Sequence, residues 1–337
     1  MSEAPKDRRP RAYPAPEFPP RKPKLFARTP PALFPALLGL LGLGLAARKG
    51  MAVLGLSSSA LGGLVEAALG ALLILWAFAL AALTVKVIRR FGVLAEDMRV
   101  LPGRAGLAAS TMSGMAAAAV LLPYAPRLAL VLVLTALVAH AGMAILLLAT
   151  LAKLSPDARS VSPAFHLAFV GFIVGAGPLA QLGYLGLATA IFWATMGLAL
   201  AIWAVSVWQL WRSEPPGPLR PLLAIHLAPA ALLSLVAGQI GAPGLAVGFV
   251  GLGMVIFLGL LSAARWITVA GFSPLWGSFT FPLSAFALAL LSLGGTWELP
   301  GIVVLAVALG VVPAIGWSVL SLWPGNRLAV KTNAAEA

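Results

Sequence analysis

Residues 60–88 read ALGGLVEAALGALLILWAFALAALTVKVI, an apolar run that decides the structural class of this protein. A helix rises about 1.5 Å per residue, so about 20 apolar residues cross the hydrocarbon core of a bilayer. Only Glu66 and Lys86 are charged in this run, and neither lies in its middle. The stretch therefore predicts a transmembrane helix.

The whole chain has the composition of a membrane protein. Of its 337 residues, 61% are hydrophobic and 10% are charged, whereas a soluble domain averages roughly 25% charged residues. There is no cysteine, which excludes disulfides and thiolate metal sites. We predict an all-α membrane domain at 30–324 in the lipid bilayer, with a disordered, basic, Pro-rich cytoplasmic tail at 1–29 and a short cytoplasmic tail at 325–337.

Ten apolar runs are long enough to cross a bilayer. Pro, Gly or charged residues mark most of the breaks between them. The sequence therefore predicts a polytopic protein of ten transmembrane helices. The runs cover residues 31–48, 60–88, 105–123, 126–152, 163–182, 184–211, 219–239, 243–268, 274–294 and 300–323.

The basic residues predict the orientation of these spans. Cytoplasmic loops are enriched in Lys and Arg. All but three of the 23 Lys and Arg fall in the two tails and the even-numbered loops or the helix ends beside them; the exceptions are Arg48, Lys49 and Arg127. This asymmetry predicts cytoplasmic termini and a plasma membrane location, which is the inner membrane in a bacterium. The net charge of +13 then reflects topology, and we predict no nucleic-acid partner.

Proline divides the ten spans into two sets. A proline inside a helix removes a hydrogen bond, and membrane helices tolerate it where neighbours or a water-filled path satisfy the freed carbonyl. In the odd-numbered spans we predict kinks at Pro35, Pro178, Pro229 and Pro282, whereas only Pro313 is clearly interior to an even-numbered span. We predict an inner layer of odd-numbered helices and an outer layer facing lipid. Prolines and serines that merely aid helix packing are the alternative.

Polar side chains follow the same division. The candidates for lining a pore are Ser113, His166, His226, Ser278 and Thr280. A lone His in a membrane helix more often joins helices by a hydrogen bond than relays protons.

Two arginines lie near the predicted cytoplasmic ends of helices. Arg104 and Arg265 could raise the local anion concentration there, or simply be solvated. The sequence holds no catalytic constellation and no cofactor or metal motif, so an enzyme is not expected.

Two segments resemble a known family. Residues 224–230 read AIHLAPA, and residues 272–283 read FSPLWGSFTFPL. They are similar to the seventh and ninth helices of the tellurite-resistance and C4-dicarboxylate transporter family, which includes TehA and the plant slow-type anion channels. Residues 31–47 and 97–104 are similar to the first helix of this family and to its link into the third. The chain departs from the family pattern at Gly277 and Ser278, where the family has Trp and Ala.

The resemblance implies five helical hairpins in a quasi-five-fold arrangement around a central pore, and a homotrimer with one pore in each subunit. A phenylalanine of the ninth helix blocks the pore in this family, and by motif position it is Phe281 here. A large apolar ring can close a narrow path by its bulk and by dewetting. Ordinary helix packing is the alternative role for Phe281.

The predicted function is an anion channel or uniporter that passes small anions. One alternative is a proton-coupled carrier that exports tellurite or C4-dicarboxylates, with His166 or His226 as its titrating group. The other is a membrane sensor or assembly subunit that acts through residues 1–28.

Overall fold

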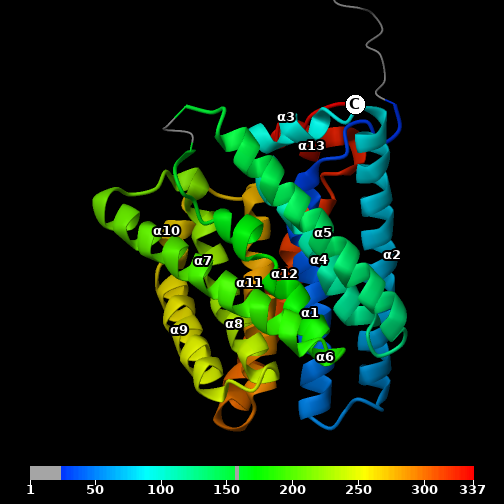
Figure 1. Cartoon of the computed structure of the whole chain (residues 1–337), viewed down its shortest axis with the longest axis vertical. Coiled ribbons are helices and arrows are strands. Elements are labelled where there is room, and N and C mark those ends of the chain that lie inside the picture. The colour runs from blue at the N-terminus through cyan, green and yellow to red at the C-terminus, as the bar shows by residue number, and fades with distance from the viewer. Residues whose placement is uncertain (1–23, 156–158) are drawn as a thin grey trace, which may run out of the picture.

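The structure is a computed structural model, and it describes residues 24–155 and 159–337. Within those ranges the regular secondary structure is helical throughout, as predicted (Figure 1). Residues 1–23 of the predicted basic tail lie outside the described residues. The elements in chain order are η1 (Pro31–Leu33), α1 (Phe34–Val53), α2 (Ala60–Arg89), α3 (Val93–Arg99), α4 (Leu101–Leu121), α5 (Pro126–Leu151), η3 (His166–Val170), α6 (Ile173–Gln181), α7 (Leu185–Arg212), η4 (Gly217–His226), α8 (Leu227–Gln239), α9 (Pro243–Ser262), α10 (Ala264–Ile267), η5 (Pro274–Trp276), α11 (Gly277–Leu293), η6 (Gly295–Trp297), α12 (Glu298–Leu320), η7 (Pro324–Asn326) and α13 (Arg327–Lys331).

Eight segments of the described chain are long and apolar enough to cross a membrane, so the multi-pass class is confirmed. The other two predicted spans coincide with α4 and with the shorter segment His166–Gln181. The buried positions of α4 are mostly Ala, Gly, Ser and Met. Small residues let membrane helices approach closely, and a helix surrounded by protein needs less apolar surface than one surrounded by lipid. The count of ten stays a prediction. The eight segments are Pro31–Val53, Ala60–Arg89, Pro126–Leu151, Leu185–Arg212, Gly217–Gln239, Pro243–Ser262, Pro274–Leu293 and Gly295–Leu320.

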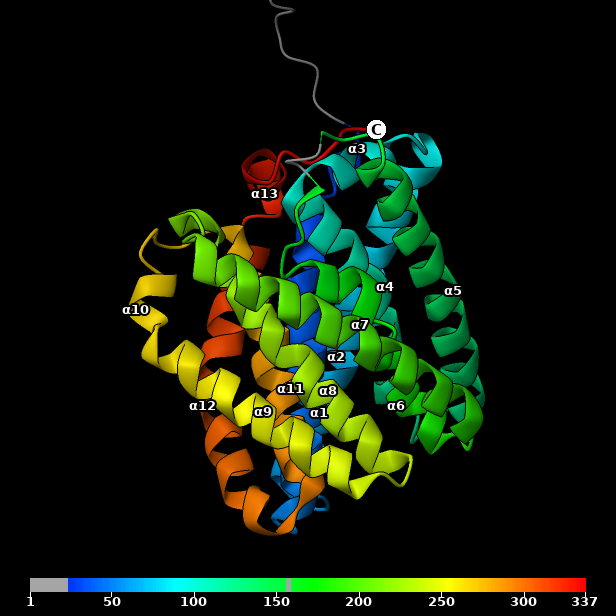
Figure 2. The same cartoon turned by 60° about the vertical axis from the view of Figure 1, so that its left-hand side comes forward.

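The long helices form five consecutive hairpins. The pairs in contact are α1 with α2, α4 with α5, α6 with α7, α8 with α9 and α11 with α12. The first helix of each pair also contacts the first helix of the next, and α11 returns to α1. The contacts therefore close a ring of α1, α4, α6, α8 and α11. Figures 1 and 2 show the hairpins running between the two ends of the molecule.

Burial separates this inner ring from the outer helices. In the most apolar 18 residues of each inner span long enough to cross a membrane, 67 to 83% of the residues are buried; these spans are Pro31–Val53, Gly217–Gln239 and Pro274–Leu293. The corresponding fraction in the five outer spans is 22 to 39%. The outer helices expose many large apolar side chains, including Ile74 of α2 and Val138 of α5. Such surfaces are stable against lipid tails and not against water.

Two inner spans are interrupted where continuous helices were predicted. The fifth begins with a π-helical turn, η3, and continues after Gly171 and Phe172 as α6. The seventh begins with a ten-residue 3₁₀ helix, η4, that contains Pro221 and leads into α8. Runs of 3₁₀ helix this long are uncommon, and π turns concentrate at functional sites. Pro35 lies in the first turn of α1 rather than in its interior, so it removes no helical hydrogen bond there.

Helices α1 and α11 approach each other closely. A Cβ added at Gly39 would lie 2.1 Å from Thr280 Oγ1. The Thr280 hydroxyl lies 3.0 Å from the carbonyl oxygen of Pro35, and the Ser284 hydroxyl lies 3.0 Å from that of Gly39. Small residues and interhelical hydrogen bonds are the usual means of helix association in lipid.

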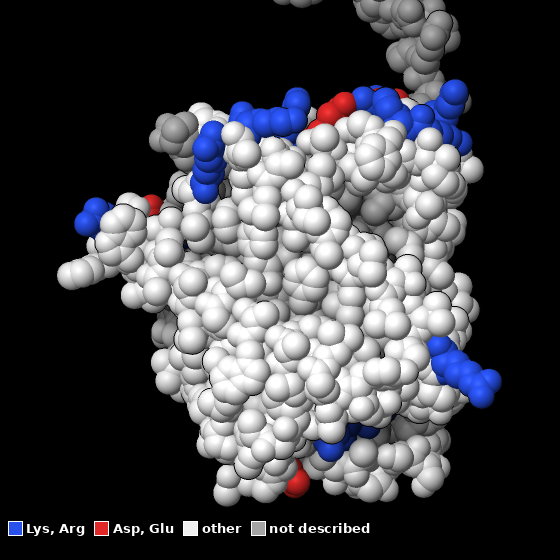
Figure 3. Space-filling model, in the orientation of Figure 1, with Lys and Arg blue, Asp and Glu red and all other residues white. Residues whose placement is uncertain are grey.

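Charge marks the two ends of the molecule. On the face that Figure 3 shows, most Lys and Arg side chains gather along the upper end, where Figure 1 places α3 and α13. A few lie near the lower end, and the broad band between them is uncharged. An uncharged band of this kind fits the hydrocarbon core of a bilayer.

The two ends of the described chain meet at the upper end. Asp97 Oδ2 lies 2.7 Å from Lys86 Nζ in a fully buried ion pair, and its Oδ1 accepts a hydrogen bond from the backbone N–H of Ala335. Lys86 Nζ also donates to the carbonyl oxygen of Thr29. The segment predicted as a short tail at 325–337 includes α13, whose Leu328 is buried against the domain.

Candidate functional site

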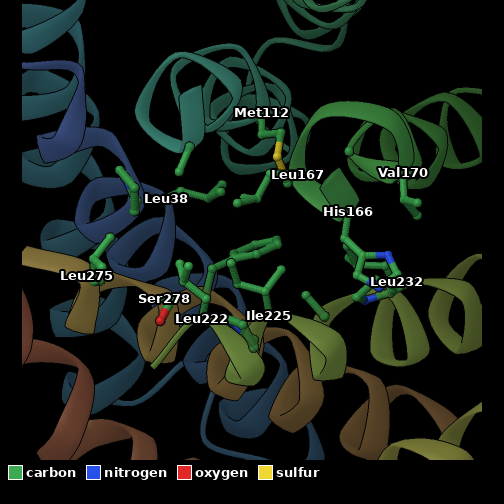
Figure 4. A pocket seen from close by; sticks show the side chains of 18 of the residues that line it. Leu38, Met112, His166, Leu167, Val170, Leu222, Ile225, Leu232, Leu275 and Ser278 are labelled. Carbon is green, nitrogen blue, oxygen red and sulfur yellow. The ribbon is translucent and has the colours of Figure 1, made fainter. Parts of the chain in front are cut away.

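A small cavity lies inside the ring near the amino end of α1. We call it the Pro35 cavity; its volume is about 50 Å³, and the only polar side chains that line it among the described residues are His166 and Ser278. Every lining residue belongs to one of the five inner spans. Figure 4 shows side chains converging on it from those spans, for example Leu38, Met112 and Leu222.

A second, larger cavity opens toward the other end of α1. We call it the Lys49 cavity; its volume is about 690 Å³. Its lining comes from the same five spans, with additions from Pro123 beyond α4 and from Pro243 and Ala246 of α9. It is more polar than the Pro35 cavity. The polar side chains that line it are Arg48, Lys49, Gln181, Ser234, Gln239 and Ser292.

Phe281 lines both cavities, together with Ile173 and Leu232. Its side chain is 6% exposed. The ring packs against α1 at Gly42, where an added Cβ would lie 3.1 Å from Phe281 Cδ2. These three apolar side chains therefore lie between the small cavity and the large one.

The four prolines predicted to kink the inner helices all lie on these cavities. Pro35, Pro229 and Pro282 line the Pro35 cavity, and Pro178 lines the Lys49 cavity. Pro178 and Pro282 lie inside α6 and α11, and Pro229 lies in the first turn of α8.

The candidate hydroxyl groups are divided. Ser278 lines the Pro35 cavity and donates to the carbonyl oxygen of Pro221 at 2.6 Å. Ser113 lines neither cavity, because its hydroxyl accepts a hydrogen bond from Trp76 Nε1 at 2.9 Å. Thr280 also lines neither and faces α1. Thus only Ser278 of these three residues borders open space.

Two of the candidate histidines form a pair. His166 Nε2 and His226 Nδ1 lie 3.0 Å apart, which joins η3 to the end of η4. Both side chains are buried, and only His166 lines the Pro35 cavity. One ring must donate and the other must accept in this contact, so at least one imidazole has an unprotonated nitrogen.

The candidate basic residues at the upper end line neither cavity. Arg104 donates to the carbonyl oxygens of Met98 and Arg99, at 2.7 and 3.1 Å, and so satisfies the carboxyl end of α3. Arg265 lies exposed on α10.

Arg48 and Lys49 line the Lys49 cavity although the sequence did not predict them as site residues. The predicted first span ended at residue 48, but α1 continues to Val53. This extension turns both basic residues into helical positions beside a cavity. The available signal was the spacing of Gly42, Leu45, Lys49 and Ala52, which places all four on one face of a helix.

A model of the SLAC1 family, described as voltage-dependent anion channel, matches residues 28–323. The chain belongs to this family. The match confirms the resemblance found in the sequence, and it supports transport of anions across a membrane rather than catalysis. No curated protein matches the chain. In the part of the chain that the structure describes, no group of three or more His, Asp or Glu side chains is placed to hold a metal ion.

Proposed function

We propose that this protein is a channel for small anions, with its pore along the axis of the inner ring and the Phe281 ring as its gate. The observation that carries the proposal is that Phe281 borders both cavities. Removing that ring would take away the largest of the three apolar side chains that lie between the two cavities.

The sizes of the cavities support this role. At about 30 Å³ per water molecule, 690 Å³ holds on the order of 20 waters, enough to keep an ion largely hydrated. The Pro35 cavity is far smaller and almost wholly apolar. Narrow apolar constrictions close to ions by dewetting, so the segment around Phe281 has the properties of a gate.

The charge of the lining supports selection of anions. No described carboxylate lines either cavity, whereas Arg48 and Lys49 line the larger one. Basic side chains in a pore favour anions and repel cations.

The gate is tested with Phe281→Ala. Removing the ring should increase the anion current of the purified protein in planar bilayers by about tenfold or more, which corresponds to a barrier lowered by about 1.4 kcal/mol. Phe279→Ala is the matched control, because Phe279 lies on the same helix, packs against Trp276 and lines neither cavity. Equal currents in wild type and Phe281→Ala, at equal amounts of reconstituted protein, would contradict the gate.

The His166–His226 contact favours a second candidate, a proton-coupled anion carrier. The same recordings separate the two. The reversal potential of a channel follows the anion gradient alone, whereas that of a coupled carrier shifts with an imposed pH gradient and loses this shift in His226→Ala.

The proposal includes the assembly and location expected from the sequence: a homotrimer with one pore in each subunit, in the plasma membrane, with both termini cytoplasmic. The exposed apolar side chains of α2, α5, α7, α9 and α12 support contact of these helices with lipid or with neighbouring subunits.

A further inference from the structure

The Lys49 cavity holds a positive charge that no carboxylate of residues 24–155 and 159–337 neutralises. Arg48 is paired: its guanidinium donates to both carboxylate oxygens of Glu66, at 2.7 and 2.6 Å, and Tyr124 donates to the same carboxylate at 2.8 Å. Lys49, the next residue, has no carboxylate partner among the described residues and lines the cavity directly. The net charge of this group is therefore positive.

The same cavity holds an unused hydrogen-bonding group. Gln239 lines it from the carboxyl end of α8, and its Oε1 is buried with no partner among the described residues. Because the oxygen and nitrogen of a carboxamide are assigned from their hydrogen bonds, an unpartnered amide can equally turn its NH₂ group into the cavity. That group would donate to an anion without adding a charge.

We infer that the Lys49 cavity is a binding vestibule for small inorganic anions such as chloride, in which Lys49 attracts the ion and Gln239 binds it. This inference rests on the proposed channel function and adds a binding site to it. The two residues act by different physics. Attraction by Lys49 is long-range and is screened by salt, whereas a hydrogen bond from Gln239 acts at contact and is not.

The screening gives a direct test in the conducting Phe281→Ala background. Lys49→Gln should reduce the current of anions entering from the Lys49 side about two-fold at about 10 mM salt, the effect that Coulomb's law gives for one unit charge about 10 Å away in water. At about 1 M salt, where the Debye length is about 3 Å, the difference should vanish. Lys49→Glu changes the charge by two units instead of one, so it should change the logarithm of the current at low salt by roughly twice as much as Lys49→Gln. Gln239→Leu should reduce the current at both salt concentrations.

Arg127→Gln is the matched control. Arg127 is exposed in the first turn of α5, directly after the connection from α4, and lines neither cavity. If Lys49→Gln and Arg127→Gln change the current equally at low salt, Lys49 does not serve the pore and the inference is wrong.

Binding can be measured without any current. Excess line broadening of the chlorine magnetic resonance signal reports chloride exchanging on the purified wild-type protein. Lys49→Gln and Gln239→Leu should each lower it relative to Arg127→Gln. Unchanged broadening in both variants would overturn the vestibule even if the channel conducts. Reduced broadening without any Phe281→Ala current would instead contradict only the proposed gate and pore.

Discussion

Among single residues, Lys86 and Asp97 carry the most consequential charges for stability. Both side chains are fully buried. Asp97 also accepts a hydrogen bond from the Ala335 N–H, and Lys86 also donates one to the Thr29 carbonyl oxygen. Burial raises the pKa of the Asp97 carboxyl, and the adjacent Lys86 opposes that shift. A buried pair of this kind often contributes little net stability, but breaking it leaves one charge without a partner.

We therefore expect Asp97→Ala to lower the free energy of unfolding by about 3–5 kcal/mol. The neighbouring Glu96→Ala is the control, because its pair with Arg90 is exposed to solvent and contributes little to stability. The double variant Lys86→Met/Asp97→Leu should recover most of the loss, since no charge is then left buried. Thermal unfolding in detergent measures all three. A loss from Asp97→Ala no larger than that from Glu96→Ala would show that the ion pair does not hold this end together.

Among single residues, the local sequence singled out Phe281 as a candidate and marked Lys49 only weakly. Phe281 lies in the FTFP stretch that carries the family resemblance, so the local sequence singled it out, and its role as a gate stays a prediction. Lys49 follows Arg48 and precedes a glycine, which reads equally well as the end of a span. Only the extra turn of α1 places it on the Lys49 cavity.

Among the elements, the contact between α1 and α11 is the most extensive in the inner ring. Gly39→Ala should break it, because the new methyl group would meet the Thr280 side chain and the backbone nitrogen of Phe281. Overpacking of this kind costs about 1–3 kcal/mol. Gly70→Ala in α2 is the control, since nothing lies within 4 Å of its added Cβ and alanine is the better helix former. Thermal unfolding should separate the two variants. Equal or raised stability in Gly39→Ala would show that α1 and α11 can move apart freely.

The element types were predictable, but their local form was not. An apolar span of about 20 residues reads as a helix whether its turns are α, 3₁₀ or π, since composition and length are the same for all three. Pro229 predicted a kink in the seventh span, yet a proline removes only one hydrogen bond and does not decide which neighbouring carbonyls find other partners. The resulting η4 helix and the η3 turn bring His166 and His226 together across 60 positions of the chain, a contact outside the reach of local sequence patterns.

At the scale of the whole molecule, the division into inner and outer helices was predictable because each layer has a different solvent. The outer helices α2, α5, α7, α9 and α12 are long and strongly apolar, so their length and composition alone identify them as able to cross a membrane. Inner helices such as α4 contact mainly protein, which permits glycine, serine and proline and weakens the apolar signal. The same chemistry that makes an inner helix suitable for a pore makes it harder to identify as a span.

The distribution of Lys and Arg predicts the orientation of the whole molecule in the membrane. The connection between α1 and α2 and the segment around α13 lie at opposite ends of the molecule (Figure 1). Because the chain has no cysteine, single substitutions report topology without background. Ser58→Cys and Lys331→Cys suit this purpose, since both positions are exposed.

We expect a membrane-impermeant maleimide to label Ser58→Cys in intact cells and to label Lys331→Cys only after permeabilisation, because the end rich in Lys and Arg stays in the cytoplasm. The reverse pattern would place the basic end outside and contradict the charge argument. Nine crossings separate the two sites if all ten spans cross the membrane, and seven if neither α4 nor the His166–Gln181 segment does, so both counts place the sites on opposite sides. Labelling of both from the same side would mean that one of these two segments crosses the membrane and the other does not. The experiment therefore tests the orientation, and whether α4 and the His166–Gln181 segment either both cross the membrane or both do not.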